Sequence, residues 1–161
     1  MSQESATDPL SLIYNSIVDV FSTDEFIKSL HDNQSIFLDF LPPRSPSSST
    51  NLMPPARNMP RMSLMQEAIT WGTNNSCTGR IDFAISVKIT GFGTRSVGFN
   101  PLVFHLLKMT RPGQLDATLR LLQYQEKQLK TISRGGNASY EYDEERQLWT
   151  CSIPVEIQIY M

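Results

Sequence analysis

The sequence predicts an α+β fold: a mainly antiparallel sheet with one or two packed helices, preceded by a helical arm and a proline-rich linker. Three observations predict it. Residues 81–90 alternate between apolar and polar side chains, as in a strand with one buried face. Residues 155–160 alternate in the same way. Between them, Asn100 and Pro101 precede an apolar segment and suit the start of a helix.

Residues 1–41 are predicted to form an acidic helical arm. Asp8 is a good helix N-cap, and Pro9 suits the first helical position because its missing N–H costs nothing there. Ser22 or Thr23 is expected to cap a second short helix. The apolar stripe of the first helix consists of Leu10, Ile13, Tyr14, Ile17 and Phe21.

Residues 42–62 are predicted to be a flexible linker, because six of the 10 prolines and a Ser/Thr run at 47–50 fall there. The apolar run before it, 36–41, suits either a core strand or a helical turn. Flexible methionine side chains adapt to varied apolar grooves, so the end of the linker is a candidate for self-association. The residues assigned to that role are Met53, Pro54, Pro55, Met59 and Met62.

The remaining residues, 63–161, are expected to form the globular domain. A short helix is predicted over residues 64–69, ending before Gly72. The strand over 81–90 follows, and then the helix over 102–109. Residues 114–132 fit both a strand and a helix, and a strand to about Tyr124 followed by a turn or helix is favoured.

The C-terminal part reads as a hairpin followed by a last strand. Tyr140 and Tyr142 begin a strand, and the polar residues 143–146 form its connection. Pro154 marks an edge or a bulge because proline donates no ladder hydrogen bond. The final strand covers 155–160.

The formal net charge of −2 hides an uneven distribution. Residues 1–39 hold seven acids and one base, residues 40–134 hold twelve bases and four acids, and residues 135–161 hold five acids and one base. An acidic arm can therefore dock on the basic middle, either within one chain or on a neighbour. Docking between chains is head to tail, and such contacts extend into larger assemblies.

The basic middle is the candidate site for phosphates or anionic lipid headgroups. The alternative is a scattered solubilising surface. The candidate residues are Arg80, Lys88, Arg95, Lys108 and Arg111. Arg120, Lys127, Lys130 and Arg134 extend the same run.

No enzymatic motif is present, and we expect a protein without a catalytic site, cofactor, metal or small-molecule substrate. The carboxylates at 141–145 fall in a solvated hairpin, and His105 lies in an apolar helix, where a structural role is expected. Cys77 and Cys151 are expected to be free thiols. The first residues do not resemble a signal peptide, so secretion is not expected.

The sequence resembles the rhabdovirus matrix proteins, and among them the short ones of plant cytorhabdoviruses. The resemblance rests on residues 81–90 with Arg95 and the helix from Asn100, on residues 155–160, and on the proline-rich segment before the α+β body. It covers about the last 100 residues. Unlike the better-known members, this chain begins acidic and lacks a Pro-Pro-x-Tyr motif.

The resemblance implies a viral structural protein that self-associates and links ribonucleoprotein to a membrane. The expected partners are further copies of the chain, viral ribonucleoprotein or RNA, and an anionic membrane surface bound peripherally. The expected location is the host cytoplasm and the virion. Two alternatives remain open at this point: an RNA-binding regulatory protein such as a viral silencing suppressor, and an adaptor that binds partners through its proline-rich linker.

Overall fold

The computed structural model describes residues 8–33, 35–40, 60–72, 79–92, 97–111, 113–125, 127–128, 130–135 and 137–160. Most of the predicted linker, residues 41–59, lies outside these ranges. In chain order the elements are α1 (Pro9–Thr23), α2 (Glu25–Asp32), β1 (Phe37–Leu38), β2 (Arg61–Gly72), β3 (Arg80–Phe92), the 3₁₀-helix η2 (Val97–Phe99), α3 (Asn100–Thr110), α4 (Asp116–Leu119), β4 (Gln123–Tyr124), β5 (Lys127–Gln128), β6 (Lys130–Arg134), β7 (Ser139–Asp143) and β8 (Leu148–Tyr160).

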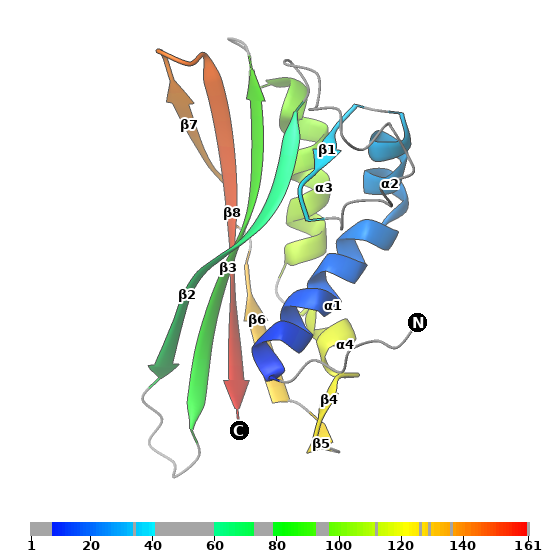
Figure 1. The fold of residues 1–161 in the computed structure, drawn as a ribbon, viewed down its shortest axis with the longest axis vertical. Coiled ribbons are helices and arrows are strands. Elements are labelled where there is room, and N and C mark those ends of the chain that lie inside the picture. Colours follow the sequence, from blue (N-terminus) through cyan, green and yellow to red (C-terminus); the bar gives the residue numbers. More distant parts are fainter. Residues whose placement is uncertain are drawn as a thin grey trace, which may run out of the picture.

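One large sheet organises the fold. Its strand order is β1-β2-β3-β8-β6, and β7 also pairs with β8. The pairing of β1 with β2 is parallel, and the other pairings in this sheet are antiparallel. Helices cover one face of the sheet (Figure 1). The predicted fold class, α+β with a mainly antiparallel sheet, is confirmed.

The core lies between the sheet and the helices, and the N-terminal arm belongs to it. Most odd-numbered residues of β3 and β8, such as Phe83 and Ile157, are buried against the helices, whereas their even-numbered neighbours lie on the opposite face. Ile13, Ile17 and Phe21 of α1 join the same apolar cluster. The arm therefore packs on its own chain in this structure.

Several local predictions are confirmed. The Asp8 carboxylate caps α1 by accepting a hydrogen bond from the Ser11 amide at 2.8 Å. The strand predicted over 81–90 is β3, and the helix predicted at Asn100 is α3. Asn100 is the first residue of this helix rather than its cap, and Phe99 precedes it without a side-chain cap hydrogen bond. The polar connection at 143–146 joins β7 to β8.

Pro154 lies inside β8, which is a single continuous strand rather than the two segments predicted from the sequence. On the side of β8 away from β3, β7 pairs up to Ser152 and β6 pairs from Glu156. Pro154 falls between these two partners, so its missing N–H costs no ladder hydrogen bond on that side. Pro154 therefore lies in a short stretch of β8 that has no partner strand on that side, which agrees with the predicted edge position.

The helix predicted over residues 64–69 is wrong, because these residues belong to β2. Met62 and Leu64 face the core, and a bulge between Gln66 and Ala68 then shifts the alternation by one residue. A strand with one extra residue places apolar side chains at spacings that resemble those of a helix. The predicted domain boundary at 62/63 falls within this strand.

The strand favoured up to Tyr124 is also wrong over most of its length. Residues 116–119 form the one-turn helix α4, and only Gln123 and Tyr124 are extended, pairing with β5. Asp116 begins this turn and its buried carboxylate accepts the Ser133 amide at 2.8 Å. The second helix is capped by Asp24, one residue beyond the predicted Thr23.

Candidate functional site

The outer edge of β2 is open over much of its length. β3 pairs with β2 along its length, whereas the two-residue β1 covers only Arg61 and Met62 on the other side. The next carbonyl that points out from this edge, that of Leu64, is also satisfied, because the Tyr14 hydroxyl donates a hydrogen bond to it at 2.9 Å. Burial raises the pKa of Tyr14, which keeps this donor protonated. Beyond Leu64, no strand of the described ranges covers this edge.

The start of β2 is held in place by β1 and the residues around it. The Asp39 amide donates to the Met62 carbonyl at 2.9 Å, and the Arg61 side chain lies 3.5 Å from the Asp39 carboxylate. Burial raises the pKa of Asp39, and the positive charge of Arg61 opposes that rise. The Arg61 guanidinium also lies 5.4 Å from the centre of the Phe37 ring. The open edge of β2 therefore begins only after Leu64, beyond residues that β1 and Tyr14 hold in place.

The open part of β2 exposes large apolar side chains. All seven residues from Met65 to Trp71 are exposed. Met65, Ile69 and Trp71 have 45%, 51% and 75% of their surfaces accessible. Ile69 and Trp71 pair with Phe83 and Ile81, so they point to the helix-facing side of the sheet at a corner that the helices leave uncovered (Figure 1). A long exposed apolar edge strand is a pairing site for another chain.

The opposite edge of the sheet is partly closed. The Ser133 amide of β6 donates a hydrogen bond to the Asp116 carboxylate, and α4 packs against this strand. β7 has β8 as its only neighbour within the described part of the sheet. Tyr142 of β7 stacks on Trp149 with ring centres 4.4 Å apart, and Tyr140 donates a hydrogen bond to Asn100. β7 is thus a second open edge, and its tyrosines fix it to β8 and to α3.

The predicted phosphate-binding residues do not gather on one surface. Arg80 and Lys88 lie on the sheet face away from the helices, where Arg80 pairs with Asp82 at 3.0 Å and Lys88 pairs with Glu67 at 3.3 Å. Lys108 and Arg111 belong to the helical layer on the other side. Lys108 lies 4.9 Å from the Phe104 ring centre, and Arg111 donates to Gln114. Arg95 lies outside the described residues.

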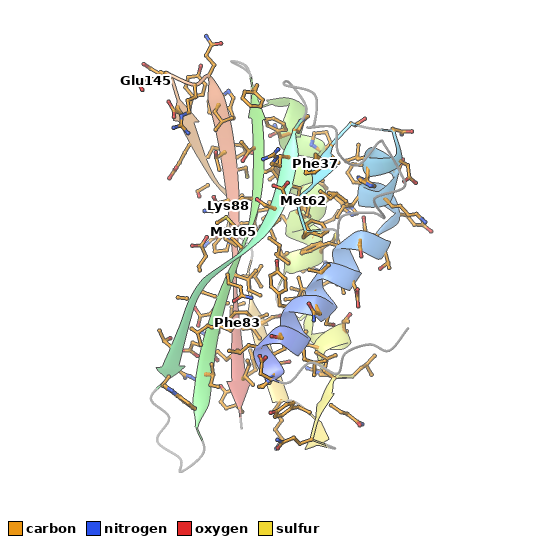
Figure 2. All side chains as sticks on the ribbon, in the orientation of Figure 1. Phe37, Met62, Met65, Phe83, Lys88 and Glu145 are labelled. Carbon is orange, nitrogen blue, oxygen red and sulfur yellow. The ribbon has the colours of Figure 1, made fainter. Side chains whose placement is uncertain are left out.

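The predicted self-association residues are placed in part. Met62 is fully buried beside Leu38 and Ile89, its partners in the neighbouring strands, so its side chain offers no surface in this monomer. Figure 2 shows Met62 on the helix-facing side of the sheet, and Met65 with Lys88 on the other. The other residues assigned to this role, Met53, Pro54, Pro55 and Met59, lie outside the described ranges.

His105 has a structural environment. Its Nε2 lies 2.7 Å from the Asp24 carboxylate, and its ring stacks on Phe26 at 4.7 Å. The same carboxylate oxygen accepts the Ile27 amide at the start of α2. The contact therefore ties the α1–α2 junction to α3.

Within the described residues, no three His, Cys, Asp or Glu side chains gather to hold a metal ion. No helix in the same ranges is long and apolar enough to cross a bilayer. The acidic hairpin residues, including Glu145, are exposed at one end of the molecule (Figure 2).

The β2 edge is not evident from the sequence, because the bulge breaks the alternation that marks a strand. A signal is nevertheless present in the sequence. Met62 and Leu64 are two residues apart, as are Ile69 and Trp71, but the first pair falls on even and the second on odd positions. Two short alternating runs with a phase break indicate a bulged strand.

Comparison with known proteins supplies a fold likeness only. No family model matches the sequence, and no curated protein matches it. Among solved structures, 19 chains match the fold. One belongs to the virion of a native gene transfer agent particle, with a TM-score of 0.54, 9% identity and coverage of 94% of both chains. Another, known only by a serial identifier, has a TM-score of 0.45 and 12% identity over 91% of this chain and 94% of its own.

Proposed function

We propose that this protein is a non-enzymatic structural subunit of a virion-type particle and that it assembles with other copies of itself through the β2 edge. One observation carries the proposal: seven consecutive exposed residues of an edge strand, among them Met65, Ile69 and Trp71. Monomeric proteins ordinarily shorten, charge or cover such edges. Here the only ionised side chain among the seven, Glu67, is already paired with Lys88.

The fold likeness supports the same class of function. The matched chain is part of a gene transfer agent virion, and the match extends over nearly the whole of both chains. A virion subunit needs contact surfaces more than a catalytic pocket. The β2 edge is such a surface, since an added strand gains main-chain hydrogen bonds and apolar contacts together.

Analytical sedimentation of the full chain across a concentration series tests this proposal. We expect the average mass to rise with concentration. Replacing Ile69 and Trp71 with Lys places charges on the edge and removes its apolar contacts, so this variant is expected to stay monomeric. Phe104→Lys is the matched control, because Phe104 is an exposed aromatic residue on α3. A wild-type chain that remains monomeric at every concentration rejects the proposal.

The finer expectation of a matrix-type protein, which joins ribonucleoprotein to a membrane, depends on a continuous basic surface. The described bases lie on both sides of the sheet, and Arg80 and Lys88 are already paired with acids. Co-sedimentation with anionic liposomes and with single-stranded RNA tests it. Salt-sensitive binding that is lost when Lys108 and Arg111 are reversed in charge supports a matrix role, whereas absence of binding to either leaves only the structural subunit.

A further inference from the structure

We propose that the open edge of β2 in one copy receives β7 of a second copy, so that the chains associate head to tail. The inference rests on the proposed self-assembly and specifies its geometry. It follows from which edge segments are open, from strand direction, from the faces of the side chains and from charge.

The open edges leave few pairings. On one side of the sheet, β1 and Tyr14 close β2 as far as Leu64. On the other side, Asp116 closes β6 at Ser133. Residues 66–72 of β2 and residues 139–143 of β7 are the edge segments of the described strands whose outward groups meet no such contact in the structure. A contact between two different patches of the same chain repeats from copy to copy.

The directions of the two strands are compatible. β2 and β8 both run antiparallel to β3, so they are parallel to each other. β7 runs antiparallel to β8 and is therefore antiparallel to β2. Copies that keep a common strand direction place β7 of one beside β2 of the next in an antiparallel pair, which is the more stable pairing per residue.

The side chains also match face by face. Tyr140 and Tyr142 pair with Cys151 and Trp149, so they point to the helix-facing side of the sheet, as Ile69 and Trp71 do. In a continuous sheet these two apolar pairs meet on the same face. Aromatic and β-branched cross-strand pairs stabilise sheets by roughly 0.2–1 kcal/mol each.

The charges on the other face are complementary. Glu141 and Asp143 of β7 lie on the face away from the helices and are exposed. On that face, Arg80 lies opposite Gly72 at the far end of the open part of β2, and the Lys88 ammonium reaches Glu67 near its start. Each base has one acidic partner in its own chain and further N–H donors that a second carboxylate can accept.

The contact is staggered. Residues 68–72 of β2 are level with residues 156–160 of β8, whereas β7 is level with residues 148–152. The offset of eight residues corresponds to about 26 Å along the strands at about 3.3 Å per residue. Successive copies therefore step along the strand direction, and the assembly grows beyond a dimer.

A complementation experiment tests the geometry. The β2 variant carries Ile69→Lys and Trp71→Lys, and the β7 variant carries Tyr140→Lys. Each full-length variant alone is expected to be monomeric by sedimentation and light scattering. An equimolar mixture is expected to form one-to-one dimers, because the intact β7 of the first variant meets the intact β2 of the second. The dimer should not grow further, since its outer edges are both blocked.

Each outcome is distinguishable. Continued dimerisation of the β7 variant alone, with loss in the β2 variant, overturns the head-to-tail geometry in favour of β2–β2 pairing and leaves the proposed function standing. Assembly unaffected in both variants rejects both proposals. Should Tyr140→Lys unfold, as judged by circular dichroism, Glu141→Lys replaces it, because Glu141 is exposed. That reversal is expected to weaken assembly by at least tenfold in dissociation constant at low salt, and an unchanged constant contradicts the inference.

Discussion

At the scale of single residues, Gly91 and Phe99 determine the packing at the end of β3. Gly91 in β3 leaves no room for a side chain, since a Cβ there would lie 1.7 Å from Cζ of Phe99. The Phe99 ring thus occupies the space above this glycine, at the turn that leads into α3. Gly98, by contrast, has no heavy atom within 4 Å of such a Cβ.

Gly91→Ala is expected to destabilise the protein by roughly 1–3 kcal/mol, because either the Phe99 ring or the strand must move. Urea unfolding measures the change in the free energy of unfolding. Gly98→Ala is the control and is expected to have a small effect. Adding Phe99→Leu should recover part of the loss in Gly91→Ala, and strict additivity of the two changes would show that the steric explanation is wrong.

Asp24 performs two functions with one carboxylate, capping α2 and holding His105 of α3. Asp24→Ala is expected to lower the free energy of unfolding by about 2 kcal/mol, the upper end for loss of an N-cap. A double-mutant cycle with His105→Ala isolates the contact between the helices, and we expect a coupling energy of at least about 0.5 kcal/mol. Full additivity would mean that the 2.7 Å contact contributes nothing measurable.

Elements show how local signals and tertiary contacts combine. The start of α1 is determined locally, by the Asp8 carboxylate and the Ser11 amide and hydroxyl, both at 2.8 Å. β2 is determined by its neighbours, since its bulge fits the register of β3 and its first residues are held by β1. A single substitution can therefore test the start of α1, whereas the placement of β2 depends on several partner residues in β1 and β3.

The cap of α1 gives a pH-dependent prediction. Hydrogen bonds from Ser11, first from its amide and then from its hydroxyl, lower the pKa of Asp8 below its ordinary value. A lowered pKa means that the ionised cap stabilises the folded state above the unfolded-state pKa and that this stabilisation is lost as the pH falls through the folded-state pKa. Asp8→Ala is therefore expected to cost about 1 kcal/mol at pH 7 and less below pH ~3.5.

Urea unfolding of wild type and Asp8→Ala at pH 7 and at pH 3 measures this difference. Asp19→Ala is the matched control, because Asp19 is an exposed acid in the interior of the same helix. An equal cost of Asp8→Ala at both pH values would indicate that the cap does not depend on the carboxylate charge.

At the scale of the whole molecule, the described residues share one apolar core that joins segments far apart in the sequence. Residues of α1, β2, β3, α3, α4 and β8 contribute to a single apolar cluster. Cys151 lies inside it with 1% of its surface exposed. Burial raises the pKa of the Cys151 thiol, with Tyr140 opposing part of the rise, so the thiol stays neutral and shielded.

Cys151 is expected to resist alkylation in the folded protein and to react fully in denaturant. The measurement uses the Cys77→Ser chain, in which Cys151 is the one remaining thiol, with iodoacetamide labelling followed by mass spectrometry. Labelling in native buffer is expected to be slower than in urea by at least a factor of about 1,000, because it requires opening of the core. Comparable rates in the two conditions would contradict the burial of β8.

Much of the fold could be predicted because it depends on patterns within a few residues. The alternation at 81–90 predicted β3, and Asp8 with Pro9 predicted the start of α1, since period and capping act locally. The segments that failed, 64–69 and 114–124, are those in which a bulge or a single turn interrupts the period. Such interruptions are stabilised by partners elsewhere, such as Ser133 for Asp116.

The candidate interface was beyond prediction from sequence for the same reason. An open edge depends on which strand occupies the outside of the sheet, and that order follows from long-range pairing of β2 with β3 and of β7 with β8. The α+β class, the capped first helix, the central alternating strand and the acidic hairpin were predictable because each is encoded by neighbouring residues. The inward packing of the arm, the placement of the bases on two sides of the sheet and the exposure of Ile69 and Trp71 emerge only in the folded chain, because burial is a property of the assembled layers.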